Sequence, residues 1–132
     1  MASQFGKYVC IGDTIEIERE GYTFKVRVEQ DDITHISDSE CYTGKQIAAW
    51  QNDGWFYCGL VCSTWLGDQL LDDSADSLRG IECNFPESDN SYLNEIVADL
   101  FANALDNADD ARQKAIARLT NQLTALEAGA KP

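Results

Sequence analysis

The sequence predicts an α+β fold: an antiparallel sheet of about four to five strands, built from two hairpins and one further strand, with C-terminal helices packed on it. Apolar residues alternate with period two over residues 13–29 and lie on both faces of residues 55–65, as in β-strands. From residue 93 the apolar spacing changes to three and four, which indicates an amphipathic helix. Strands followed by helices are typical of α+β domains.

The first hairpin is predicted over residues 13–29. Ile15 and Ile17 face one side of the first strand and alternate with glutamates, and the second strand continues the same pattern. A two-residue Glu20–Gly21 loop places all the apolar residues on one face and sets opposite charges across from each other. This register pairs Arg19 with Tyr22, Ile17 with Phe24, Glu16 with Lys25, and Ile15 with Val26.

The second hairpin is predicted after an irregular polar stretch, residues 30–54. Within that stretch, Thr43 is a suitable cap for a short helix that reaches Trp50 or Gln51 and ends at Asn52–Gly54. Residues 55–65 have apolar residues on both faces, which indicates a central strand. Gly67–Asp68 then suits a type II′ turn.

An acidic loop, residues 72–77, and a last strand, Leu78–Phe85, are predicted next. A polar turn then leads into the helix within the stretch GIECNFPESDNSYLNEIVADLF, residues 80–101. A helix start of this kind can hold a phosphate. Here the turn contains its own carboxylates, Glu87 and Asp89, and good caps such as Asn90, so a structural turn is the better interpretation.

The C-terminal region begins with an amphipathic helix that we expect to pack on the sheet around Phe56, Leu60 and Ile81. Its inward face consists of Leu93, Ile96, Val97, Leu100 and Phe101. The segment DNADD either interrupts this helix or forms a polar face shared by one longer helix. Beyond it, an a/d-like stripe consists of Ile116, Leu119, Leu123 and Leu126. We expect one domain over residues 1–132, with the sheet in about 8–85 and the helical region in about 91–128.

Negative charge is the outlying feature of the composition. The chain has 23 Asp and Glu against 10 Lys and Arg, a net charge of −13. Direct binding to nucleic acid or to an anionic membrane is not expected, because both need cationic surface. A basic protein surface is the expected partner. The residues predicted to contact it are grouped in the expected loops: Asp31, Asp32, Asp38, Glu40, Asp72, Asp73, Asp76, Glu87 and Asp89. The alternative is that these acids serve only solubility.

The five cysteines are expected to be reduced. The first residues lack a basic start followed by an apolar run, so no secretion signal is predicted and the expected location is the cytoplasm. We therefore predict no intramolecular disulfide. The thiols of Cys58, Cys62 and Cys83 are expected to be buried as small apolar groups.

Candidate chemistry is sparse. The chain has one histidine and no Cys-x-x-Cys pair, so we expect no zinc site, no other metal site and no cofactor. A Cys41–His35 dyad is the remaining catalytic candidate, but its spacing matches no motif that would activate a nucleophile. A non-enzymatic protein is the prediction, and an enzyme that uses this pair is the less favoured alternative.

Two segments resemble a known family. The run NDGWFYCGLVCS, followed by DDSADSLRGIECNFPESDNSYLNEIVADLF, is similar to small acidic proteins of unknown function on bacterial mobile elements and phages. The similarity covers about residues 8–105, and GIECNFPESDNSYL is its most specific part. It implies no catalytic residues. It does imply a context, because small acidic proteins of such elements are often anti-CRISPR or antirestriction inhibitors of host defence.

These observations lead to one predicted function and one main alternative. The prediction is an inhibitor whose acidic face docks on a basic nucleic-acid-binding surface of a bacterial defence complex. The alternative is an accessory or adaptor protein of a mobile element that acts through its C-terminal helix, with a homodimer formed there. Electrostatic docking weakens with salt and helix packing does not, so salt dependence separates the two.

Overall fold

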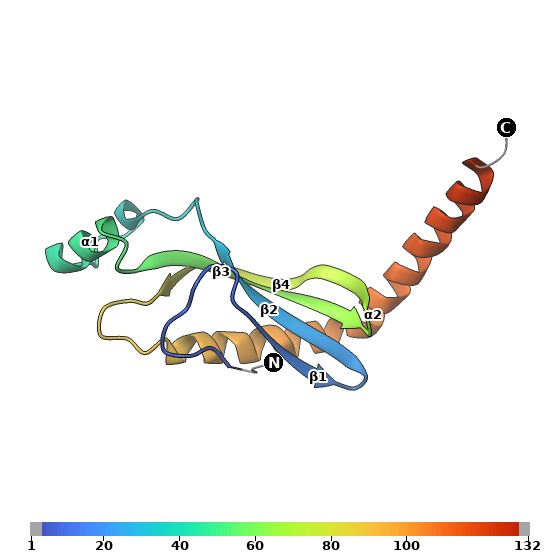
Figure 1. Cartoon of the computed structure of the whole chain (residues 1–132), viewed down its shortest axis with the longest axis horizontal. Coiled ribbons are helices and arrows are strands. Elements are labelled where there is room, and N and C mark those ends of the chain that lie inside the picture. The colour runs from blue at the N-terminus through green and yellow to red at the C-terminus, as the bar shows by residue number, and fades with distance from the viewer. Residues whose placement is uncertain (1–3, 130–132) are drawn as a thin grey trace.

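The computed structural model describes residues 4–129, and it confirms the α+β class (Figure 1). Four antiparallel strands form one sheet in the order β1-β2-β3-β4, and a long helix covers one face of it. The strands are β1 (Thr14–Arg19), β2 (Tyr22–Gln30), β3 (Phe56–Leu66) and β4 (Gln69–Cys83). The helical elements are the 3₁₀ turn η1 (Ile36–Asp38), α1 (Gly44–Gln51) and α2 (Ser91–Gly129).

The first hairpin has the predicted register. Arg19 pairs with Tyr22, Ile17 with Phe24, Glu16 with Lys25, and Ile15 with Val26. Glu20 and Gly21 both have positive φ, 54° and 86°, as the type I′ turn of a two-residue hairpin requires.

The second hairpin confirms the Gly67–Asp68 turn but corrects the acidic loop. Leu66 pairs with Gln69, and Gly67 has a φ of 58°. Residues 72–77, predicted as a loop before a separate strand, lie inside the 15-residue strand β4. Three register shifts between β3 and β4 place extra residues on β4. Asp72, Asp76 and Ser77 pair with β3, while residues 73–75 lie at one of these shifts and have no partner there. Because β4 is an edge strand, its charged side chains also disfavour pairing of this edge with strands of other chains.

The core lies between the sheet and the first half of α2. The predicted contacts are confirmed: Leu93, Val97, Leu100 and Phe101 are buried with Leu60 and Ile81, while Ile96 and Phe56 are partly buried against them. Further along α2 the inward residues become small. Ala104, Ala108, Ala111 and Ala115 are all buried, and alanines allow the helix to approach the sheet closely.

The turn before α2 is filled by its own side chains, consistent with the structural interpretation. Asn90 is fully buried; its amide donates to the Lys7 carbonyl and to Asn84 Oδ1, both at 2.8 Å. Asn84 in turn donates to the Val9 carbonyl at 2.8 Å and accepts from the Val9 amide at 2.9 Å. The two asparagines therefore fasten the N-terminal segment to the turn.

The structure contradicts the prediction of no disulfide, because Cys58 and Cys83 are bonded to each other. Cys58 pairs with Ile81 across the β3–β4 ladder, and Cys83 lies two residues further along the same face. The predicted burial of Cys58, Cys62 and Cys83 is confirmed. The cytoplasmic location stays a prediction. It was based in part on the expectation that all cysteines are reduced, and the Cys58–Cys83 bond removes that part of its basis.

The short helix α1 begins with the predicted Thr43 cap. Thr43 Oγ1 accepts from the Gln46 amide at 3.2 Å, and Gln46 Oε1 accepts from the Thr43 amide at 2.9 Å. This reciprocal pair is a capping box.

We expect Thr43→Ala to lower the free energy of unfolding by about 1 kcal/mol, because it leaves a helix N–H without its partner. Urea denaturation measures the change, with Thr43→Ser, which keeps the hydroxyl, as the control. A loss of the same size in Thr43→Ser would show that the hydroxyl is not what matters.

The C-terminal region is one helix, so the DNADD segment does not interrupt it. The buried residues of α2 end at Ala115, and the remainder projects beyond the sheet (Figure 1). The predicted stripe is exposed there: Ile116 by 49%, Leu119 by 40%, Leu123 by 57% and Leu126 by 73%. Within residues 4–129, no helix combines the length and apolar character that a bilayer span needs.

Candidate functional site

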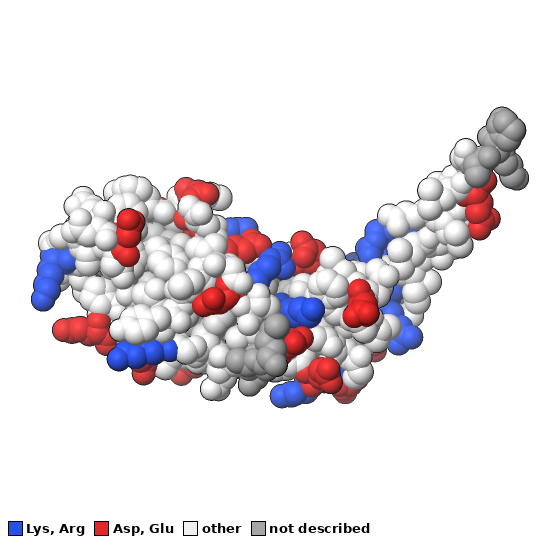
Figure 2. Space-filling model, in the orientation of Figure 1, with Lys and Arg blue, Asp and Glu red and all other residues white. Residues whose placement is uncertain are grey.

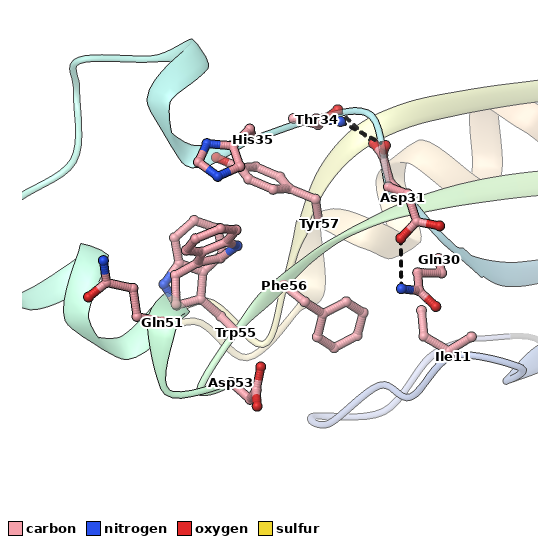
Figure 3. A pocket seen from close by; sticks show the side chains of 12 residues that line it. Ile11, Gln30, Asp31, Thr34, His35, Gln51, Asp53, Trp55, Phe56 and Tyr57 are labelled. Carbon is pink, nitrogen blue, oxygen red and sulfur yellow. Dashed lines mark hydrogen bonds between the residues drawn. The ribbon is translucent and has the colours of Figure 1, made fainter.

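A cleft of about 600 Å³ lies where the loop after β2 meets α1 and the start of β3 (Figure 3). Segments far apart in the sequence form it. Ile11 comes from the N-terminal segment, residues 30–35 from the end of β2 and its loop, and residues 50–57 from the end of α1 and the start of β3. The cleft therefore exists only because the folded chain brings the loop after β2 close to the connection between α1 and β3.

Aromatic rings form much of the cleft wall. Trp55 is almost fully buried, and its indole N–H donates to the Gln46 carbonyl at 2.9 Å. Tyr57 contacts the Trp55 ring edge to face, with centroids 5.2 Å apart, and His35 contacts Trp50 in the same way at 5.0 Å. Phe56 also lines the cleft. This packing, which also includes Phe85 against Trp55, holds the rings rigidly.

Behind the cleft, the tyrosines form a chain of hydrogen bonds that ends at a carboxylate. The Tyr57 hydroxyl donates to the Tyr42 hydroxyl at 3.0 Å, and Tyr42 donates to Glu82. Burial, followed by the hydrogen bond to Glu82, raises the pKa of Tyr42. Tyr42 therefore remains protonated at neutral pH and acts as a donor, not as a general base.

The first predicted contact residue, Asp31, has a structural role. Its carboxylate is buried and accepts four hydrogen bonds: from the amides of Ile33, Thr34 and Gly80 and from the Thr34 hydroxyl, at 2.7–3.0 Å. Burial alone would raise the pKa of Asp31, but these hydrogen bonds lower it to about 2. Asp31 thus ties the loop after β2 to β4 and has little surface left for a partner.

Two exposed carboxylates lie in the cleft lining. Asp32 accepts from the Gln30 side-chain amide at 2.7 Å, and Asp53 follows α1 with a φ of 61°. Both side chains reach solvent. No Lys or Arg is among the described residues that line the cleft, so the charge of these carboxylates is not neutralised within the lining.

The remaining predicted acids lie in three other places. Asp38 accepts from the His35 amide at 2.8 Å at the start of η1, and Glu40 is exposed just beyond η1.

The three acids on β4 each lie near a polar or cationic partner. Asp76 accepts from the Asn103 side chain on α2 at 2.8 Å, and Asp72 lies in a groove with Lys114 and Arg118. The Asp73 carboxylate lies 3.4 Å from the Arg27 guanidinium. Glu87 and Asp89 are in the turn before α2, beside Lys7.

The nine predicted acids therefore do not form one cluster. Asp32 lies in the cleft, while the β4 acids lie near Lys or Arg or hydrogen-bond to α2. On the face presented in Figure 2, carboxylates are interspersed with Lys and Arg and no broad acidic patch is seen. The cleft combines exposed carboxylates with aromatic rings and has no Lys or Arg in its described lining, whereas the groove beside Glu87 and Asp89, which also contains aromatic rings, includes Lys7.

The Cys41–His35 pair has no catalytic arrangement. His35 Nδ1 accepts from the Ser37 amide at 3.1 Å, and Cys41 Sγ accepts from the Ser39 hydroxyl at 3.0 Å. Among the described residues, no hydrogen bond joins the thiol to the imidazole. Each side chain instead has a local partner in its own loop.

Within the described part of the chain, no group of three or more His, Cys, Asp and Glu residues is placed to hold a metal ion. No protein family matches the chain, and no curated protein or solved structure is significantly similar to it. The resemblance of residues 8–105 to small acidic proteins of mobile elements stays an expectation.

Sequence reasoning missed most of the cleft. Trp50, Trp55, Tyr57 and Asp53 were assigned only to a helix, a strand and a turn. A signal was present, because WQNDGWFY, residues 50–57, concentrates four aromatic residues around an acidic turn. What the sequence did not indicate is that the loop containing Asp32 and His35 lies opposite these rings.

Proposed function

We propose that this protein is a non-enzymatic binding protein that docks on a basic protein surface, with the cleft beside α1 accepting a cationic side chain of the partner. The observation that supports the proposal is the lining of the cleft. Exposed carboxylates, Asp32 and Asp53, accompany the partly exposed rings of Trp50 and Phe56, with the buried rings of Trp55 and Tyr57 packed beneath them. The described lining residues include no Lys or Arg.

This lining suits an arginine or lysine side chain for two physical reasons. A cation over an aromatic face gains about 0.5–2 kcal/mol, more when water is excluded. A carboxylate at the rim supplies charge-assisted hydrogen bonds, and arginine can make two such contacts through its planar fork. Ile11 and Ile33, exposed by 47% and 84%, add apolar surface to the N-terminal segment and to the loop beside the cleft.

The partner class that fits best is a nucleic-acid-binding protein, because its groove concentrates the cations that such a cleft recognises. The net charge of −13 increases the rate of encounter with such a groove. Binding there would exclude nucleic acid. A bacterial defence complex is the example that the sequence resemblance implies, and it remains part of this proposal.

Tryptophan fluorescence with an oligo-arginine peptide tests the proposal, because Trp50 and Trp55 line the cleft. The cleft variant combines Asp32→Asn with Asp53→Asn. Both replacements keep an oxygen acceptor, and asparagine tolerates the positive φ of position 53. The matched control combines Asp73→Asn with Asp76→Asn on β4, which removes the same charge elsewhere.

We expect the cleft variant to bind the peptide at least about tenfold more weakly, a difference of about 1.4 kcal/mol, while the control changes less than about threefold. The melting temperatures of both variants should equal that of the wild type within about 2 °C. Equal weakening in the two variants would mean that net charge alone attracts the peptide. No weakening in the cleft variant would reject the proposal.

Competition with nucleic acid is tested separately by pull-down from a bacterial lysate, with and without nuclease. We expect nuclease treatment to increase capture of basic proteins, and the cleft variant to lose them. Capture that does not depend on nuclease or on the cleft carboxylates would contradict the proposed competition.

A further inference from the structure

The projecting end of α2 has an apolar stripe that the rest of the described chain does not cover. The stripe is Ile116, Leu119, Leu123 and Leu126, and each of these side chains is at least 40% exposed. From residue 116 to 129 the helix runs for about four turns, or about 20 Å, past its last buried residue, Ala115. We infer that this stripe pairs with the same stripe of a second copy, in antiparallel orientation.

No described residue of α2 after Ala115 is buried, so packing contributes little to the stability of this end of the helix. Clustered exposed leucines usually mark an interface. Leu119 lies one turn beyond Ala115, so the stripe continues from the face that packs on the sheet. A partner on the stripe would therefore extend an existing packed face.

The narrow width of the stripe favours packing against one helix, namely the same segment of α2 in a second copy. The spacing of three, four and three residues gives two apolar positions per heptad, which is the narrow seam of a two-stranded coil. The positions next to the seam are Ala115, Thr120, Gln122 and Glu127, of which one is charged. Self-pairing therefore brings few like charges together along the seam.

The charge distribution selects the antiparallel orientation. Residues 111–129 hold Arg112, Lys114 and Arg118 against Glu127, whereas residues 4–110 hold 22 acids against 6 Lys and Arg. Parallel pairing would place two strongly acidic bodies side by side. Antiparallel pairing places them at opposite ends of the paired helices, which lowers their repulsion.

Antiparallel pairing also gives a symmetric register. Ile116 then lies opposite Leu126 of the second copy, and Leu119 lies opposite Leu123. In that register Glu127 is level with Ala115 of the second copy, within one turn of its Lys114 and Arg118. The contact has two-fold symmetry and closes on itself, so it forms dimers and not fibres. Because it is short, we expect a dissociation constant on the order of 10 µM.

Sedimentation equilibrium of the full chain across this concentration range tests the inference. Leu119→Lys combined with Leu123→Lys should be monomeric at every concentration. Asn121→Lys combined with Thr124→Lys adds the same charge on the outer side of the helix and should keep the dimer. A monomeric wild type, or equal effects of the two variants, would overturn the inference.

Cysteine cross-linking tests the orientation, in a background where the exposed Cys10 and Cys41 are changed to Ser. A mixture of Ile116→Cys and Leu126→Cys chains should form a mixed disulfide dimer on oxidation, because the two positions lie opposite each other. Cross-linking of Leu126→Cys chains with each other instead would contradict the antiparallel register. Neither result depends on the cleft, so this inference and the proposed function can fail separately.

Discussion

Leu100→Ala is expected to lower the free energy of unfolding by about 2–5 kcal/mol, the range for emptying a buried leucine site. Leu100 is 4% exposed and packs in the core that α2 forms with the sheet. Its removal leaves a cavity that the surrounding strands can fill only partly. Urea denaturation at neutral pH, followed by circular dichroism, measures the change.

Leu123→Ala is the matched control, because it makes the same replacement on the same helix at an exposed position. Measured on the monomer, it should change the free energy of unfolding by less than about 0.5 kcal/mol. Similar losses in the two variants would mean that the first half of α2 is not more tightly packed than its projecting end, which would contradict the described core.

Asp31→Asn is expected to lower the free energy of unfolding by about 2–4 kcal/mol, since hydrogen bonds to a charged acceptor contribute about 1.5–3 kcal/mol each and an amide retains part of them. The new NH₂ group would also face donors from which Asp31 now accepts, such as the Gly80 amide and the Thr34 hydroxyl. Asp32→Asn, at the neighbouring exposed position, should change the stability by less than about 0.5 kcal/mol.

The pH dependence of stability gives a second readout for Asp31. Its pKa is about 2 in the folded protein, against 3.8 for an unperturbed aspartate, which represents the unfolded chain. Because the folded pKa is the lower one, the stabilisation is fully present above about pH 4 and is lost as the pH falls toward 2. The wild type should therefore lose more stability than Asp31→Asn over this interval. Equal losses would show that Asp31 does not titrate with this shift.

Local patterns predicted the elements that depend on local chemistry. The alternation of Ile15, Glu16 and Ile17, followed by Glu20–Gly21, determines the first hairpin because turn and face requirements agree. Thr43 marked the start of α1 because its hydroxyl satisfies a helix N–H within the same turn. The spacing from Leu93 onward identified the buried face of α2 because that face must meet the sheet.

Features that depend on register and on distant segments were not predictable in this way. The acids of residues 72–77 suggested a loop because they show no apolar alternation. An edge strand such as β4 needs little apolar surface, so its pairing with β3 leaves no such pattern in the sequence. The Cys58–Cys83 bond depends on the same ladder, which brings two residues 25 positions apart onto neighbouring strands.

The candidate site was predicted only in part, for a related reason. Charge indicated a cationic partner, and Asp32 was among the predicted contact residues. Asp31, its neighbour in sequence, was predicted to have the same role. It is instead buried, and it accepts a hydrogen bond from Gly80 on β4, a contact that the sequence pattern does not indicate. The aromatic wall was missed because the loop and α1 meet only in the folded chain.

Recognition of a cationic side chain by the cleft beside α1 can be mapped residue by residue. Nuclear magnetic resonance titration of the ¹⁵N-labelled protein with the oligo-arginine peptide provides this map. We expect chemical-shift changes to be concentrated at residues 30–35 and 50–57, including the Trp50 and Trp55 indole N–H groups, and to diminish as salt is raised. Changes centred instead on residues 72–76 of β4, with the indole signals of Trp50 and Trp55 unmoved, would show that the peptide binds elsewhere and would reject the proposed cleft.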